Sequence, residues 1–66
     1  MTNKLKIARA ARNITQEDLA EKIHVSRQSV NAIETGKYVP STILALKIAR
    51  FFDMKVEELF VLEEGD

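Results

Sequence analysis

Apolar residues recur along this chain at the three- and four-residue spacing of amphipathic α-helices, in stretches separated by short polar segments. The predicted helices cover residues 3–12, 16–23, 27–35, 42–52 and 56–60. Their apolar faces supply one candidate core: Leu5, Ala8, Ala11, Leu19, Ala20, Ile23, Val30, Ile33, Leu44, Ala45, Ile48, Ala49, Phe52, Val56, Leu59 and Phe60. Because no repeat or linker interrupts the pattern, we expect a single all-α domain of five helices over residues 1–66.

Polar residues flank these segments where helices should begin and end. Asn3, Thr15 and Ser26 stand at N-cap positions, where a side-chain oxygen can accept from a free backbone N–H. Asn13 and Gly36 follow the first and third helices, and both residue types tolerate the left-handed conformation that commonly ends a helix. The pattern therefore predicts short connections between helices.

The connection between the second and third helices is too short for an antiparallel pair. Only two residues separate the second helix from the predicted cap of the third, so the helices should cross steeply, as in a helix-turn-helix motif over residues 16–35. Counting Gln16 as position one, Ala20 is fifth, where the crossing requires a small side chain. His24 is ninth, where the turn requires positive φ, and His is among the non-glycine residues enriched there.

This motif resembles that of the λ/434 repressor and Cro family of helix-turn-helix regulators, over about Leu5 to Phe60. The segments KYxPS, ALKIA and EELF are similar to those of its small stand-alone dimeric repressors, such as the cytolysin-operon repressor. The resemblance implies a five-helix, λ-repressor-like DNA-binding domain. Some members add a β-hairpin from the two termini. The sequence leaves this open here, because MTNK is poor in β-formers and Val61 and Leu62 fit a strand, coil or subunit contact equally.

The exposed face of the third helix carries groups that suit DNA bases. With its apolar positions turned inward, Gln28, Asn31 and Ala32 point outward and Arg27 lies on the flank. In helix-turn-helix proteins the beginning of this helix reaches base edges in the major groove. Arg suits guanine and Gln or Asn suits adenine, while Ala32 could contact a thymine methyl group. These four residues are the predicted base contacts.

The predicted phosphate contacts are Gln16, Ser29, Lys37 and Tyr38. Gln16 opens the second helix, where family members bind a phosphate with the side chain and the helix N-terminus. Lys37 and Tyr38 follow the third helix, at the other edge of the same surface. Ser29 either packs beneath the neighbouring helix or donates to phosphate. Tyr38 is alternatively a half-buried loop aromatic.

Two further residues are predicted to brace the third helix. The resemblance implies an ion pair between Arg9 on the first helix and Glu34 at the end of the third. Such a pair contributes little net stability, yet loss of one partner strands the other charge.

Composition excludes most other kinds of function. The chain has no cysteine and one histidine, so it lacks a thiolate metal site, a His-rich cluster and a Cys nucleophile. No Gly-rich phosphate loop is present either, so we expect neither an enzyme nor a bound cofactor or metal. No apolar stretch is long enough for a bilayer span and no signal peptide is evident. We therefore expect a soluble cytoplasmic protein.

Charge is divided along the chain although the net charge is zero. Residues 1–40 carry seven basic and four acidic residues, whereas residues 41–66 carry three basic and six acidic ones. A basic half suits contact with phosphate.

The acidic half carries apolar residues that a chain of 66 residues should not readily bury. We expect them to form a symmetric homodimer through the C-terminal helix and tail, residues 56–66, because one motif makes too few DNA contacts alone. The predicted interface consists of Phe51, Met54, Phe60, Val61 and Leu62, with Phe60 and Leu62 at its centre.

The sequence thus predicts a sequence-specific transcriptional regulator of double-stranded DNA, acting as a repressor at a pseudo-palindromic operator. Alternatives of the same fold are an antitoxin, a restriction–modification controller or an activator. A protein-interaction module that has lost DNA binding is an alternative from another class, but it would not need Arg27, Gln28 and Asn31 on the exposed face.

Overall fold

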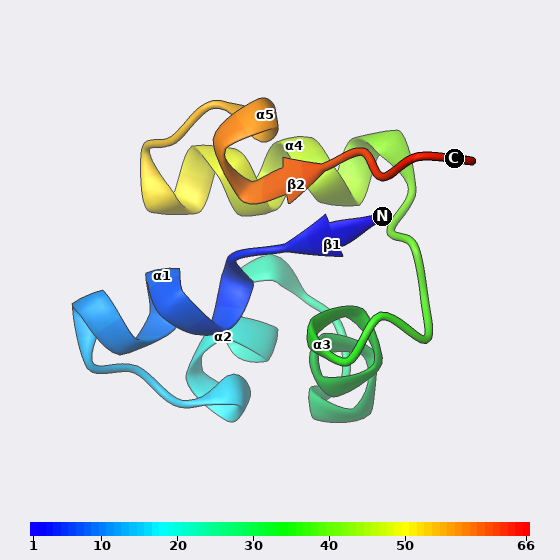
Figure 1. The fold of residues 1–66 in the computed structure, drawn as a ribbon. Helices are drawn as coiled ribbons and strands as arrows, with labels where there is room; N and C mark the ends of the chain where they lie inside the picture. Colours follow the sequence, from blue (N-terminus) through cyan, green and yellow to red (C-terminus); the bar gives the residue numbers. More distant parts are fainter.

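The structure, a computed structural model, describes all 66 residues as five α-helices and one small antiparallel sheet (Figure 1). The elements are β1 (Thr2–Asn3), α1 (Leu5–Arg12), α2 (Gln16–Ile23), α3 (Arg27–Glu34), α4 (Thr42–Phe52), α5 (Val56–Leu59) and β2 (Phe60–Val61). The predicted five-helix, λ-repressor-like class is confirmed. Figure 1 shows α4 and α5 in the upper part of the molecule and α1, α2 and α3 in the lower part, with the sheet between them.

A single apolar core joins all five helices. Its buried residues are Leu5, Ala8, Leu19, Ala20, Ile23, Val30, Ile33, Ile48, Ala49, Phe52, Leu59 and Phe60. The prediction that Ala11 belongs to this core is wrong, because Ala11 is exposed. The chain turns back at Asn13, and Ile14 packs against the core from beyond that turn. No polar or charged residue is fully buried, so apolar burial is the main source of stability.

Polar side chains fix the start of three helices, as capping chemistry predicts. Thr15 and Asp18 form a reciprocal capping box at α2, with each side chain bonded to the other's backbone N–H. The hydroxyl of Ser26 accepts from Ser29 N–H at 3.1 Å, and that of Ser41 accepts from Leu44 N–H at 3.2 Å. These caps set where the chain enters α2, α3 and α4.

Three residues other than glycine adopt the left-handed conformation at helix ends. They are Asn13 after α1, His24 after α2 and Asp53 after α4, with φ of 55°, 61° and 53°. The predicted left-handed turns at Asn13 and His24 are thus confirmed, and Gly36 after α3 also has positive φ, at 77°. Such turns let each helix stop abruptly and keep the connections short.

The beginning of α1 differs from the prediction. Asn3 is not the N-cap, since it belongs to β1 and α1 starts at Leu5. Its side chain nevertheless accepts from Leu5 N–H at 3.2 Å through Oδ1, and donates to the carbonyl of Ile33 at 2.8 Å through Nδ2. Asn3 therefore ties the N-terminal strand to the end of α3.

The two chain ends form the sheet that the sequence left open. Thr2 pairs with Val61 and Asn3 with Phe60, and Lys4 N–H donates to Leu59 O at 2.8 Å. Pairing takes Phe60 out of the helix, so α5 ends at Leu59. Strands this short are held by backbone groups and the packing of Phe60, which explains why weak β-propensity in MTNK does not prevent them.

Candidate nucleic-acid interface

Helices α2 and α3 form the helix-turn-helix unit, and its turn is compact. Ala20 is 4% exposed and its carbonyl accepts from both His24 N–H and Val25 N–H. A small side chain at this point lets the backbone of the turn lie directly against α2. The Ser26 cap then starts α3 two residues beyond His24.

The face of α3 that is turned to solvent carries three polar side chains. Arg27, Gln28 and Asn31 are exposed, and Ala32 beside them is half-buried. The opposite face buries Val30 and Ile33 in the core. The core contacts therefore fix which side of α3 is presented to a ligand, and that side is rich in hydrogen-bonding groups.

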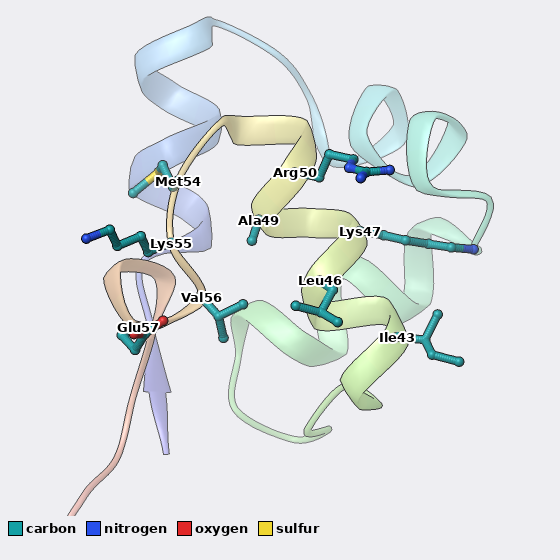
Figure 2. Close-up of a pocket in the computed structure, with 9 residues that line it drawn as sticks. All are labelled: Ile43, Leu46, Lys47, Ala49, Arg50, Met54, Lys55, Val56 and Glu57. Carbon is teal, nitrogen blue, oxygen red and sulfur yellow. The ribbon is translucent and has the colours of Figure 1, made fainter.

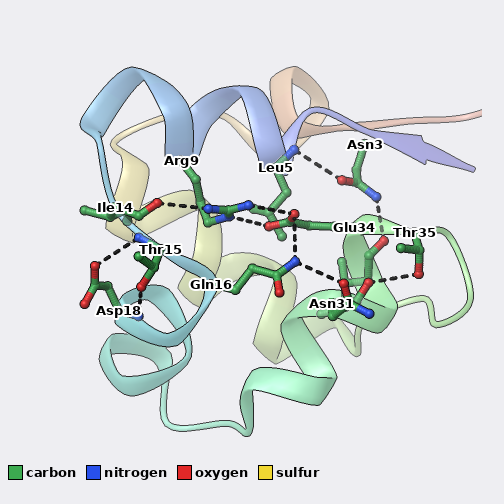
Figure 3. Close-up of polar contacts among 11 residues, drawn as sticks. Asn3, Leu5, Arg9, Ile14, Thr15, Gln16, Asp18, Asn31, Glu34 and Thr35 are labelled. Carbon is green, nitrogen blue, oxygen red and sulfur yellow. Dashed lines mark hydrogen bonds and ion pairs between the residues drawn. The ribbon is translucent and has the colours of Figure 1, made fainter.

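A continuous polar network joins α1, α2 and α3 beneath this face (Figure 3). Arg9 forms a two-pronged ion pair with Glu34, through Nε to Oε2 at 2.5 Å and Nη2 to Oε1 at 3.0 Å. Glu34 Oε1 also accepts from Gln16 Nε2 at 3.2 Å, and the same nitrogen donates to Asn31 Oδ1 at 3.1 Å. Two side chains expected to contact DNA, Gln16 and Asn31, are thus bonded to each other.

The ion pair is largely shielded from water. The side chains of Arg9 and Glu34 are 14% and 5% exposed, and a third bond runs from Arg9 Nη1 to the carbonyl of Ile14 at 2.9 Å. Its bond to the carboxylate of Glu34 raises the pKa of Arg9 above its ordinary value. Arg9 therefore stays charged, and its guanidinium is bonded to Glu34 and to the carbonyl of Ile14 within the protein.

The other predicted phosphate contacts have different surroundings. Lys37 and Tyr38 are exposed, and their backbone N–H groups both donate to the carbonyl of Ala32, which ties the loop to the end of α3. Ser29 is half-buried and its hydroxyl lies 3.0 Å from that of Ser26. The Ser29 hydroxyl therefore belongs to the cap of α3.

A shallow polar hollow lies between the beginnings of α2 and α3. It is lined by Arg9, Ile14, Thr15, Gln16, Glu17 and Arg27. Arg27 is the residue on its rim that has a free positive charge, since Arg9 is paired with Glu34. The other charged residue of the lining is Glu17, so the hollow carries one unpaired charge of each sign.

The five residues of the predicted dimer interface do not form one exposed surface. Phe60 is 8% exposed and belongs to the core, while Phe51 and Met54 are half-buried. Val61 and Leu62 are exposed to solvent, at 39% and 78%. Phe60 is therefore occupied by the core and is not available at the centre of an interface, whereas Val61 and Leu62 are exposed as expected.

A different apolar surface is exposed on α4. Ile43 and Leu46 are 69% and 55% exposed, and with Ala49, Met54 and Val56 they line a groove against α5 (Figure 2). The sequence carries a signal for it: TILALKIARFF is apolar around much of its circumference, more than one core-facing stripe requires. The prediction missed Ile43 and Leu46 because it considered only one face of this helix. We call this surface the α4–α5 groove.

The crossed pair α2 and α3, with a buried inner face and a polar outer face on the second helix, defines a helix-turn-helix DNA-binding domain. Comparison with known proteins identifies the family. The family model Helix-turn-helix (HTH_3) matches residues 5–59. The chain therefore belongs to this family of Cro/repressor-type transcriptional regulators, and it is a DNA-binding regulator.

Relatives and a solved structure agree with this assignment. An HTH-type transcriptional regulator of Methanocaldococcus jannaschii is 58% identical, covering 100% of both chains. YgzD of Bacillus subtilis, also an HTH-type transcriptional regulator, is 55% identical over 97% of each chain. The crystal structure of the restriction–modification controller protein C.AhdI from Aeromonas hydrophila superposes with a TM-score of 0.79 at 33% identity, covering 86% of each chain.

Proposed function

We propose that this protein is a sequence-specific repressor that binds a pseudo-palindromic site in double-stranded DNA as a symmetric homodimer. The observation that carries the proposal is the outer face of α3, where Arg27, Gln28 and Asn31 are exposed while the inner face is held by the core. Side chains of this chemistry, on a helix of this orientation, match base edges in the major groove. As a regulator of transcription it acts in the cytoplasm, where the DNA is.

Within this site, the residues divide into those that select sequence and those that hold the DNA backbone. Arg27 can donate to guanine, and Gln28 can donate to N7 and accept from N6 of adenine, while Ala32 lies beside them for contact with a thymine methyl group. Lys37 and Tyr38 hold phosphate at the other end of α3, since their loop is fixed to Ala32 through two backbone bonds.

The homodimer is built on the α4–α5 groove rather than on Phe60. Ile43, Leu46 and Val56 form its apolar centre, with Val61 and Leu62 as additional exposed apolar side chains. A concentration of exposed apolar side chains favours association, and a two-fold axis uses the same surface on both copies. Helix α4 lies on the side of the molecule away from α3 in Figure 1, so pairing leaves both copies of α3 free.

Charges at the groove also suit self-association. Lys47 and Arg50 border it on the α4 side, and Lys55 and Glu57 on the α5 side (Figure 2). In a symmetric pair, Glu57 of one copy can face Lys47 or Arg50 of the other. This arrangement offsets the repulsion expected between two acidic tails.

We favour repression over activation because repression requires only that the protein binds DNA. A dimer bound at a promoter excludes RNA polymerase from the same DNA, whereas activation needs a further surface that contacts polymerase. The likeness to a restriction–modification controller supports a second candidate, in which the protein regulates the genes of a restriction–modification system. Mapping the promoters bound in cells, together with the change in transcription on deletion, separates these roles.

The test of the proposed function is a selection of bound sequences from random double-stranded DNA. The proposal expects an inverted repeat whose half-sites are centred about 34 Å apart, one turn of DNA. An enriched site without symmetry contradicts the dimer, and the absence of any enriched sequence contradicts sequence-specific binding. Sedimentation equilibrium on the same protein measures the dimer independently.

A further inference from the structure

The side chain of Asn3 bridges two helices that are far apart in the sequence (Figure 3). Its Oδ1 accepts from Leu5 N–H at the start of α1 at 3.2 Å, and its Nδ2 donates to the carbonyl of Ile33 near the end of α3 at 2.8 Å. Because a backbone N–H only donates and a carbonyl only accepts, these partners fix the direction of the Asn3 amide. The side chain therefore has one defined orientation between α1 and α3.

The carbonyl of Ile33 is one of the last in α3, where backbone acceptors lack a partner further along the helix. It accepts from Gly36 N–H at 3.0 Å as well as from Asn3, so both of its lone pairs have donors. The bond from Asn3 is the only hydrogen bond in the structure that joins α3 to the sheet, α4 or α5. Asn3 thus provides a directional contact between α3 and the upper part of the molecule.

Apolar packing alone defines the tilt of α3 less sharply. Helix α3 packs chiefly against α2, and α4 packs against α2 and α5, so α3 and α4 are related through α2. Apolar contact is non-directional, whereas a hydrogen bond weakens as its angle departs from linear. Residues 39–41, which lead from α3 to α4, belong to no helix or strand. Asn3 is therefore the contact that most directly resists a tilt of α3 relative to α4.

The sheet that carries Asn3 adjoins the proposed dimer surface. Asn3 pairs with Phe60 of β2, and Phe60 lines a second hollow together with Leu46 and Val56 of the α4–α5 groove. Val61, the next residue of β2, is one of the exposed apolar side chains assigned to the dimer. Asn3 thus lies between the surface on which two copies pair and the helix that each copy presents to DNA.

We propose that Asn3 is a positioning residue that sets the spacing between the two half-sites that the dimer accepts. This inference rests on the proposed function, in which two copies pair through the α4–α5 groove. A tilt of α3 relative to that groove occurs in both copies, so the two-fold axis doubles its effect on the separation of the two α3 helices. One added base pair moves a half-site by about 3.4 Å and rotates it by about 34–36°, so helices held at a fixed separation should reject it.

The experiment uses the inverted repeat obtained by selection, and two versions of it whose central spacer is one base pair shorter or longer. The wild type should bind the selected spacing at least about tenfold more tightly than either altered spacing, because a displaced half-site loses at least one good base contact. Asn3→Asp keeps an acceptor for Leu5 N–H but removes the donor to Ile33. This variant should lower the ratio below about threefold, because a freer α3 regains that contact on the altered spacers.

Two further variants separate the lost bond from the added charge. Asn3→Ser is uncharged and too short to reach the carbonyl of Ile33, so it should lower the ratio as Asn3→Asp does. Thr2→Asp is the matched control, because Thr2 is the neighbouring residue of β1, is exposed, and has a side chain that does not bond to α3. Thr2→Asp should keep the wild-type ratio.

Two more measurements separate positioning from a general loss of structure. Base preferences within one half-site should be the same in Asn3→Asp as in the wild type, since the outer face of α3 is unchanged. Dimerisation measured by sedimentation equilibrium should also be the same, since the groove is unchanged. Thermal unfolding checks that each variant is folded.

Three results overturn the inference. The first is that folded Asn3→Asp and Asn3→Ser keep the wild-type ratio. The second is that both variants weaken binding to all three spacings equally, as a purely structural role would. The third is a wild type that binds all three spacings alike, which leaves the proposed function standing. A wild type that stays monomeric or binds no inverted repeat overturns the proposed function as well, which distinguishes the two failures.

Discussion

The guanidinium of Arg9 and the carboxylate of Glu34 meet through two hydrogen bonds, and this pair fixes the end of α3 against α1. The two residues are 25 positions apart in the sequence. Glu34 in turn bonds to Gln16, so one ion pair connects all three N-terminal helices. Since α3 carries the proposed base contacts, the pair holds the interface as well as the fold.

Removing Glu34 alone should be costly. Glu34→Ala leaves the guanidinium of Arg9 with little solvent and no carboxylate, which should lower the free energy of unfolding by about 3–5 kcal/mol. Replacing both residues, as Arg9→Met with Glu34→Leu, should recover much of that loss because no charge is left unpaired. Urea unfolding of the wild type, both single variants and the double variant gives the coupling energy. A cycle without coupling contradicts a paired role for these residues.

The turn between α2 and α3 should distinguish side chains by their tolerance of positive φ. His24 has φ of 61°, so His24→Gly should leave stability unchanged or raise it by about 1 kcal/mol. His24→Val should lower stability by about 1–3 kcal/mol, because a β-branched residue is strained in this conformation. Thermal unfolding of the two variants measures this contrast. Equal stability of the Gly and Val variants would mean that the turn relaxes to another conformation.

The chain termini should make stability depend on pH on the alkaline side. The amino group of Met1 contacts Asp66 and Glu63, and hydrogen bonds to these carboxylates, first to Asp66, raise its pKa above the ordinary value of 8.0. The contribution is complete below the unfolded-state pKa and is lost as pH rises through the higher folded-state pKa. Thermal unfolding from about pH 7 to about pH 10, which brackets the ordinary value of 8.0, measures it.

Acetylation of the N-terminus provides the control for this effect. The acetylated protein has no titrating amino group, so its stability should lack this alkaline loss. If both forms lose stability equally over the interval, another group is responsible for the dependence.

The dimer should respond to charge in the α4–α5 groove more than elsewhere. Leu46→Lys places an ammonium group in the groove and should weaken self-association at least about tenfold, since burying an unpaired charge is unfavourable. Ile7→Lys is the matched control, because Ile7 is as exposed as Ile43 but lies on α1. Leu62→Lys reports on the contribution of the tail. Sedimentation equilibrium that shows equal dimerisation of Leu46→Lys and wild type would place the interface outside the groove.

Local chemistry made the helices and their turns predictable. The capping residues Thr15 and Ser26 and the left-handed turns at Asn13 and His24 depend on neighbours within a few positions, so the sequence indicates them directly. The exposed face of α3 follows from its apolar positions by the same reasoning.

What could not be predicted depends on contacts between distant segments. The pairing of Asn3 with Phe60 turns an expected helix cap into a strand residue and brings Phe60 into the core. The bond from Gln16 to Asn31 also depends on how α2 and α3 cross, which periodicity does not specify. Ion pairing of Arg9 with Glu34 was indicated only by resemblance to a family, because nothing local relates the two residues.

The central claim, that α3 selects the DNA sequence while its flanking loop holds the backbone, is tested most directly by comparing Gln28→Ala with Lys37→Ala. Affinities for the selected site, single-base variants and unrelated DNA should be measured across salt concentrations. Gln28→Ala should weaken the free energy of binding to the selected site by about 1–3 kcal/mol and relax the base preference at one base pair. Lys37→Ala should weaken all DNA alike and lower the salt slope by about one. Unchanged affinity and base preference in Gln28→Ala would contradict the claim.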